Sequence, residues 1–180
     1  TENVEYMDSM FQNCESLTSL NISHFNTKKI KNMANMFDSC LKIKSIQIEP
    51  EIFNTSLVTN MAYMFRNCKE LLSFDVSQFN TALVTNMRNM FDSCKKLTII
   101  NTGNFNTSKV TDMQSMFSNC RELKSLDVSN FDTSLVTNMR EMFQLCPKLI
   151  SLNVSSFDTS KVINLEKMFS NCQLINFLNV

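Results

Sequence analysis

The sequence predicts a single α/β solenoid, a right-handed coil of about seven 26-residue repeats that spans residues 1–180. The first observation is the spacing of the cysteines, which is 26 residues at every step but one, where it is 28. The second is that all 13 methionines fall into two columns when the copies are aligned on cysteine. A fixed period between about 20 and 50 residues is typical of solenoids, in which each copy packs on its neighbours. The seven cysteines are Cys14, Cys40, Cys68, Cys94, Cys120, Cys146 and Cys172.

The first half of each copy is predicted to form a short helix. In the third copy, the apolar residues of segment 61–68 stand at positions i, i+3, i+4 and i+7, which lie on one face of a helix. Thr59 or Asn60 precedes them as a suitable N-cap. The methionine stripe is interpreted as core rather than as a binding groove, because a stacked core requires the same residue in the same column.

The second half of each copy is predicted to form a strand on the opposite side of the coil. In the fifth copy, Leu126 and Val128 alternate with polar residues at a period of two. Strands of successive copies are expected to pair in parallel, about 4.8 Å apart. Each strand is followed by Phe, then Asn or Asp, then Thr, and the short Asx side chain can close this corner without glycine. The second copy has two extra residues around Glu49, Pro50 and Glu51, and we expect a bulge there.

The fuller string M-F-x-x-C-x-x-L-x-S-L-x-V-S-x-F-[ND]-T-S-x-V-T-N-M resembles a leucine-rich repeat, and it is similar to the BspA-like repeats of bacterial surface proteins. It most closely resembles the branch of unknown function found in mycoplasma lipoproteins. The resemblance implies a leucine-rich-repeat-like solenoid and an extracellular, surface-attached location. It also implies a role in adhesion, host interaction or antigenic display, and it offers no catalytic residues to carry over.

Composition and spacing argue against several kinds of chemistry. The 17 basic and 17 acidic residues cancel, whereas nucleic-acid binders usually show a basic excess. No cofactor or metal is expected, since cysteines 26 residues apart do not match the close pairs of a zinc site. We expect seven free, buried thiols, because stacked cysteines lie too far apart for a disulfide. His24, the one histidine, is interpreted as a variable surface residue of a turn.

Polar side chains that alternate with the apolar strand residues form the candidate binding surface. The plain interpretation is a solvated strand face, and the functional one is a flat recognition surface for a protein or glycan. Asp75 and Asp127 are two carboxylates of this surface, but they lie two turns apart with no evident pocket, so a glycosidase pair is not expected. A second candidate surface carries Lys95, Arg121, Glu122 and Lys148. The first surface comprises Ser73, Asp75, Asn101, Ser125, Asp127, Ser151 and Asn153.

The sequence therefore predicts a non-enzymatic bacterial cell-surface interaction module that binds a host or matrix protein or glycan. The alternatives are a structural spacer or antigenic stalk, and an intracellular leucine-rich-repeat scaffold. Membrane attachment is expected only through parts of the protein outside this sequence. Neither end carries a recognisable polar cap, so we expect a piece of a longer array or end-to-end stacking of copies.

Overall fold

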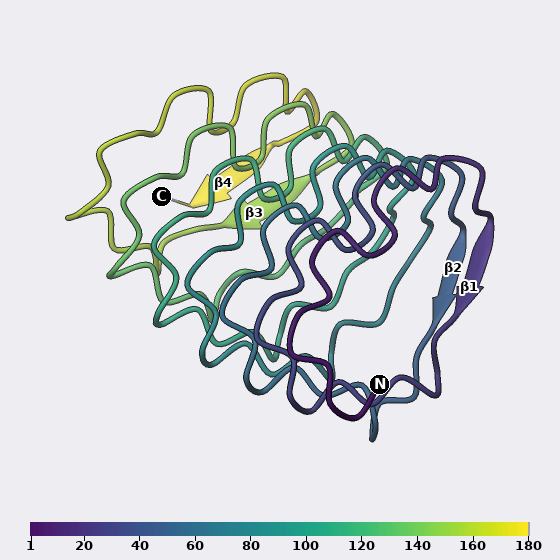
Figure 1. Cartoon of the computed structure of the whole chain (residues 1–180). Coiled ribbons are helices and arrows are strands. Elements are labelled where there is room, and N and C mark those ends of the chain that lie inside the picture. The colour runs from purple at the N-terminus through teal and green to yellow at the C-terminus, as the bar shows by residue number, and fades with distance from the viewer. Residues whose placement is uncertain (180) are drawn as a thin grey trace.

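The computed structural model describes residues 1–179 as a coil whose successive turns stack side by side (Figure 1). The two termini lie in the turns at opposite ends of the stack (Figure 1). The prediction of a repeat solenoid is therefore confirmed. No helix within residues 1–179 is long and apolar enough to cross a membrane.

Parallel strands form at the two ends of the coil. Strand β1 (Ser19–Asn21) pairs with β2 (Ser45–Gln47), and β3 (Ser151–Asn153) pairs with β4 (Phe177–Asn179). Between these pairs the predicted strands are extended segments with little pairing: the Thr98 amide donates to the Leu72 carbonyl at 3.2 Å. Within residues 1–179, no backbone hydrogen bond joins β2 to segment 71–76. The predicted sheet is thus correct in place and direction but is interrupted in the middle.

A second parallel ladder runs through all the copies, with one bridge at each step. The backbone amides on either side of Asn86 donate to two different copies. The Thr85 amide donates to the Thr59 carbonyl of the preceding copy, and the Met87 amide donates to the Asp112 carbonyl of the following copy. The side chain of Asn86 also accepts from the Arg88 amide at 3.0 Å. This column was predicted both to cap helices and to form a ladder of hydrogen bonds; the ladder is confirmed, and the helix capping is wrong because there are no helices to cap within residues 1–179. The ladder comprises Tyr6, Asn32, Asn60, Asn86, Asp112, Asn138 and Asn164.

The predicted short helices are wrong, because residues 1–179 contain no helix. The apolar residues of segment 61–68 are fully buried as expected, but their backbone follows a different path. The Met64 amide donates to the Met61 carbonyl three residues back, whereas the next amide, of Phe65, donates to Met90 of the following copy at 2.9 Å. Turns within a copy therefore alternate with bonds between copies, which a continuous helix would not allow.

The cause of this path is a pair of left-handed residues in every copy, four residues apart. Among residues 1–179, fourteen non-glycine residues have φ between 53° and 62°, and ten of them are Asn or Ser. Asparagine visits the left-handed region more readily than most residues, because its short side chain can hydrogen-bond locally. The fourteen are Ser9, Asn13, Asn35, Ser39, Tyr63, Asn67, Asn89, Ser93, Ser115, Asn119, Glu141, Leu145, Lys167 and Asn171.

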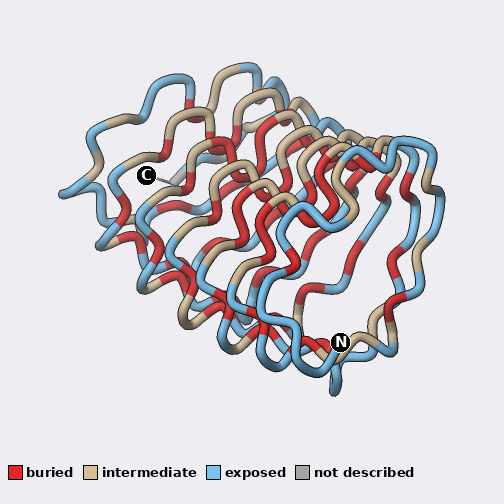
Figure 2. Tube along the Cα trace, in the orientation of Figure 1, coloured by how far each residue is buried: buried red, intermediate tan, exposed pale blue. Residues whose placement is uncertain are grey.

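The core is a set of apolar columns that run the length of the coil, as the sequence predicts (Figure 2). The clearest is a ladder of stacked phenyl rings, with centroids 5.4 to 6.0 Å apart and planes within 18° of parallel. The first and last turns are much more exposed than the middle (Figure 2). The ladder comprises Phe11, Phe37, Phe65, Phe91, Phe117, Phe143 and Phe169.

The cysteines are all free, and five of them are buried beside this ladder. The Cys94 thiol donates to the Phe65 carbonyl of the preceding copy at 3.1 Å. Each of the other four buried thiols likewise donates to the carbonyl of the ladder Phe in the copy before its own. The expectation of seven buried thiols is wrong for Cys14, which is exposed, and for Cys172, which is half-buried. Both lie in end copies, which are packed on one side.

Candidate binding surface

The seven residues of the predicted surface are all exposed and lie along one side of the coil, which we call the strand face. Ser151 and Asn153 belong to β3, and Ser125 bridges to Ser151. Ser73, Asp75 and Asn101 lie in the unpaired middle segments. The alternation rule therefore predicted the outward direction of these side chains correctly.

The carboxylate and amide members of the strand face also hold the backbone. The Oδ1 atom of Asp75 accepts from the Ser77 amide at 2.9 Å, and Asn101, Asp127 and Asn153 accept in the same way, two residues on. Hydrogen bonds from the Ser129 side chain and amide lower the pKa of Asp127. Each of these side chains thus closes an Asx turn and keeps its second oxygen or amide nitrogen for other contacts. An Asx-x-Ser pattern was the available signal for this role in three of the four, and Asn101 is followed by Gly103 instead.

Large apolar side chains interrupt the polar strand face, and sequence reasoning missed them; two lie in neighbouring middle copies, and Ile150, in the sixth copy, is 48% exposed. Ile99 occupies the column of Ser73 and Ser125 in the fourth copy and is 61% exposed. Leu72, in the neighbouring third copy, is 52% exposed. The departure of this copy from the serine column was visible in the sequence. The strand face therefore combines an apolar centre with polar surroundings.

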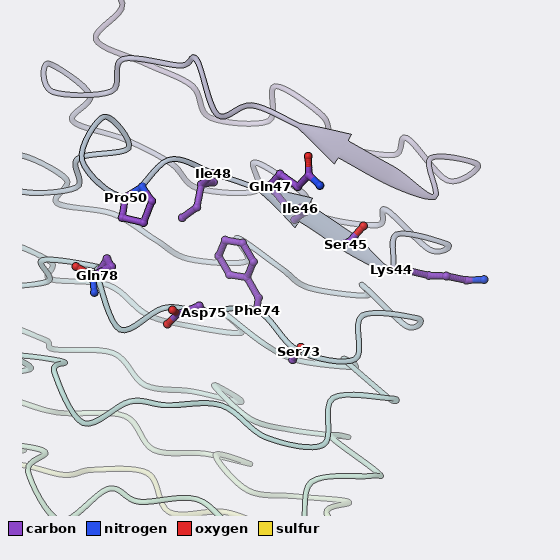
Figure 3. A pocket seen from close by; sticks show the side chains of 10 residues that line it. All are labelled: Lys44, Ser45, Ile46, Gln47, Ile48, Pro50, Ser73, Phe74, Asp75 and Gln78. Atoms are coloured by element: carbon purple, nitrogen blue, oxygen red, sulfur yellow. The ribbon is translucent and has the colours of Figure 1, made fainter.

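A hollow of about 380 Å³ opens on the strand face between β2 and the following copy (Figure 3). Figure 3 shows the Phe74 ring in the space between β2 and the segment that carries Ser73 and Asp75. The expected bulge is confirmed beside it, where the Ile52 and Phe53 amides both donate to the Glu49 carbonyl. Polar lining groups include Lys44, Ser45, Gln47 and Gln78.

The strand face does not assemble a recognisable catalytic or metal centre. Asp75 lines the hollow, but Asp127 does not, so these carboxylates do not share a cavity. Within residues 1–179, no group of three or more His, Cys, Asp or Glu side chains could hold a metal ion. His24 is exposed, with its ring edge-on to Phe25 at 5.1 Å between centroids.

A partly buried ion pair links the first three copies, and sequence reasoning missed it too. The Asp38 side chain is 1% exposed and accepts from Nε and Nη2 of Arg66 at 2.9 and 2.7 Å, and from Gln12 at 2.9 Å. Burial alone would raise the pKa of Asp38, but the hydrogen bonds from Arg66 and Gln12 outweigh it and lower the pKa. The Arg66 guanidinium also lies over the Tyr63 ring, 4.6 Å from its centroid. The Asp38–Arg66 pair therefore stabilises the contact between copies, and its charges are already partnered within the coil.

The geometry defines a class: a repeat solenoid with extended, outward-facing surfaces along the coil. The sequence matches the family described as Mycoplasma protein of unknown function, DUF285, over residues 1–49, 43–127 and 98–178. The chain belongs to this family, which confirms the resemblance predicted from the repeat string. No curated protein matches the chain.

Two solved structures have a backbone fold similar to that of this chain. The first is a leucine-rich-repeat protein of T. pallidum, with 17% sequence identity, a TM-score of 0.44, and coverage of 98% of this chain and 63% of that one. The second is a leucine-rich cell surface protein of Faecalibacterium prausnitzii A2-165, with 16% identity, a TM-score of 0.37, and coverage of 95% and 62%. The chain thus spans less than two thirds of the length of either protein.

Proposed function

We propose that this chain is a non-enzymatic interaction module of a bacterial cell surface, which binds a host or matrix protein or glycan through the strand face. The observation that carries the proposal is the exposed centre formed by Leu72 and Ile99 within a polar surface. Binding interfaces commonly combine a desolvated apolar core with a polar rim. Membership of the family and the resemblance to BspA-like surface repeats support the location.

The strand face has the physical properties of a weak, repeated binding surface. Its backbone is held by Asx turns and by the stacked core beneath, so little conformational freedom is lost when a partner binds. The face is shallow, so we expect modest affinity for one molecule and stronger attachment when many copies act together on one cell.

A structural spacer or antigenic stalk is the second candidate, and one observation favours it. The side chains of Asp75, Asn101, Asp127 and Asn153 each stabilise their own turn, which is sufficient reason for polar residues in that column. A stalk would need no binding by the strand face at all.

The test compares two triple variants that add the same charge to different faces. The strand-face variant carries Ser73→Arg, Ile99→Arg and Ser125→Arg, which place bulky cations across the proposed centre. The control carries Leu57→Arg, Leu83→Arg and Leu135→Arg, in a column where other copies already have Lys29, Lys109 and Lys161. Binding of each purified chain to arrayed matrix proteins and glycans is measured. We expect the first variant to lose binding and the control to keep it.

Two results would contradict the proposal. If the unmutated chain binds no arrayed protein or glycan, the stalk is the better description. If both variants lose binding equally while their thermal unfolding is unchanged, the partner contacts some other surface.

A further inference from the structure

The charges of this neutral chain are strongly segregated along one edge of the strand face. We call the four residues that follow each cysteine the basic ridge. It holds eight of the 17 basic residues and three of the 17 acidic ones, so it carries a net charge of +5 and the rest of the chain −5. The basic members are Lys42, Lys44, Lys69, Lys95, Lys96, Arg121, Lys124 and Lys148.

The opposite edge of the strand face has the reverse charge. Segments 47–54, 75–80, 127–132 and 153–158, each of which runs from a strand into its corner, contain six carboxylates and no Lys or Arg. The equivalent segments 21–26 and 101–106 contain no charged Lys, Arg, Asp or Glu. The strand face therefore separates a basic edge from an acidic one, which the net charge of the chain conceals.

The structure aligns the basic ridge along the axis of the coil. The Lys96 amide donates to the Lys69 carbonyl, and the Glu122 amide donates to the Lys95 carbonyl, both at 3.2 Å, so ridge segments of successive copies lie side by side. The spacing of copies follows from the phenyl ladder, whose centroids are 5.4 to 6.0 Å apart. Cations at this interval form a line rather than an isolated patch.

Most of these cations are free to bind an anion. Lys96 pairs with Glu70 at 2.7 Å, and Lys148 pairs with Glu122 at 2.6 Å. The other six basic residues of the ridge form no ion pair with residues 1–179. Three of the six, Lys42, Lys44 and Lys69, line a second hollow of about 360 Å³ together with Glu70, whose carboxylate is paired with Lys96.

We infer that the basic ridge binds a sulfated polysaccharide that lies along the axis of the coil. A line of uncompensated cations concentrates a polymer that carries regularly repeated anions. The ridge adjoins the centre of the strand face, where Leu72 belongs to both, but the cations that carry this inference lie outside that centre, so the inference does not depend on the proposed function.

Two other polyanions fit the ridge less well. Proteins that bind single-stranded nucleic acid without sequence preference stack the bases on aromatic side chains, and the seven ridge segments contain no Phe, Tyr or Trp. An anionic membrane is a plane, and a plane laid on the strand face would also meet the acidic edge at Glu49, Glu51 and Asp127. A single polysaccharide chain can follow the ridge and avoid those carboxylates.

The experiment measures binding of the whole chain to heparin, with fully desulfated heparin as the matched ligand. The ridge variant carries Lys69→Gln, Lys95→Gln and Arg121→Gln; the seventh copy already has Gln173 at this position. The control carries Lys29→Gln, Lys109→Gln and Lys161→Gln, which remove the same charge from another face. We expect the ridge variant to lose roughly tenfold or more in affinity, the control to change little, and binding to weaken as salt rises.

Each remaining outcome would overturn the inference. Absence of heparin binding at low salt, or equal binding of desulfated heparin, would remove the proposed ligand. Equal losses of heparin affinity in the two variants would indicate that binding depends on the overall charge of the chain rather than on the ridge. Equally tight binding to phosphatidylserine vesicles or to single-stranded DNA would assign the ridge to another polyanion. The strand-face arginine variant separates the two proposals, because it should lose its protein or glycan partner but not heparin.

Discussion

Each buried thiol of the core is held in a position that suppresses its reactivity. Burial raises the pKa of Cys40 to about 11 and that of Cys146 to about 12, and it raises the pKa values of Cys68, Cys94 and Cys120 well above the usual value. Because the thiolate is the nucleophile, these groups stay protonated and unreactive at any pH near neutrality. Cys14 lacks this protection, since it is exposed.

We predict that a disulfide-exchange reagent at pH 8 distinguishes three classes of cysteine in the native chain. Cys14 should react in the fast phase, half-buried Cys172 more slowly, and the five buried cysteines at the rate of global unfolding. Absorbance of the released thiol measures the phases, and Cys14→Ser should abolish the fast one. Fast reaction of more than two thiols in the folded chain would show that the reagent reaches the buried cysteines without global unfolding.

At the scale of the element, burial was predictable and backbone conformation was not. The spacing i, i+3, i+4, i+7 correctly identified the buried residues of segment 61–68, because side chains that meet one core must recur at that interval in a tight coil. The same spacing arises from turns that alternate with bonds between copies. A signal against helix was present in Asn89 and Ser93, which are poor helix formers repeated in the same columns elsewhere.

The left-handed positions make a prediction about one exceptional residue. Leu145 has φ 57°, in a column that otherwise contains Asn or Ser. The left-handed conformation costs an ordinary residue roughly 1–2 kcal/mol, so Leu145→Asn should stabilise the chain by about 1 kcal/mol after a small loss of apolar burial. Urea denaturation measures the change. The control is Leu135→Asn, at a residue that is 40% exposed and does not have a positive φ, where no gain is expected; equal gains would contradict the strain argument.

At the scale of the whole molecule, the sequence predicted which side chains face outward, but not where the backbone pairing between copies is interrupted. Alternation in the strands placed Ser73 and Ser125 outward, and the two-residue insertion was recognised as a bulge. The hollow beside β2 was not predicted, because it depends on the missing backbone bonds between that strand and segment 71–76. Pairing of copies is a long-range property that no single repeat encodes.

The stacking of copies predicts how stability is distributed along the coil. Phe91 is fully buried between Phe65 and Phe117, with centroids at 5.4 and 5.7 Å, whereas half-buried Phe11 stacks on Phe37 alone. Phe91→Ala should therefore cost roughly 3–5 kcal/mol, the range for truncating a buried aromatic side chain. Phe11→Ala should cost clearly less, because half of its ring contacts and burial are missing.

Calorimetry and urea denaturation of the two variants measure this difference, with Phe91→Leu and Phe11→Leu as matched controls that keep an apolar side chain. In a nearest-neighbour stack, each copy is stabilised by its own contacts and by the interface on either side. A central substitution weakens two interfaces and an end substitution weakens one, so the ratio of the losses reports the interface contribution directly. Equal losses at Phe91 and Phe11 would mean that the end copy is supported by contacts other than those of the phenyl ladder.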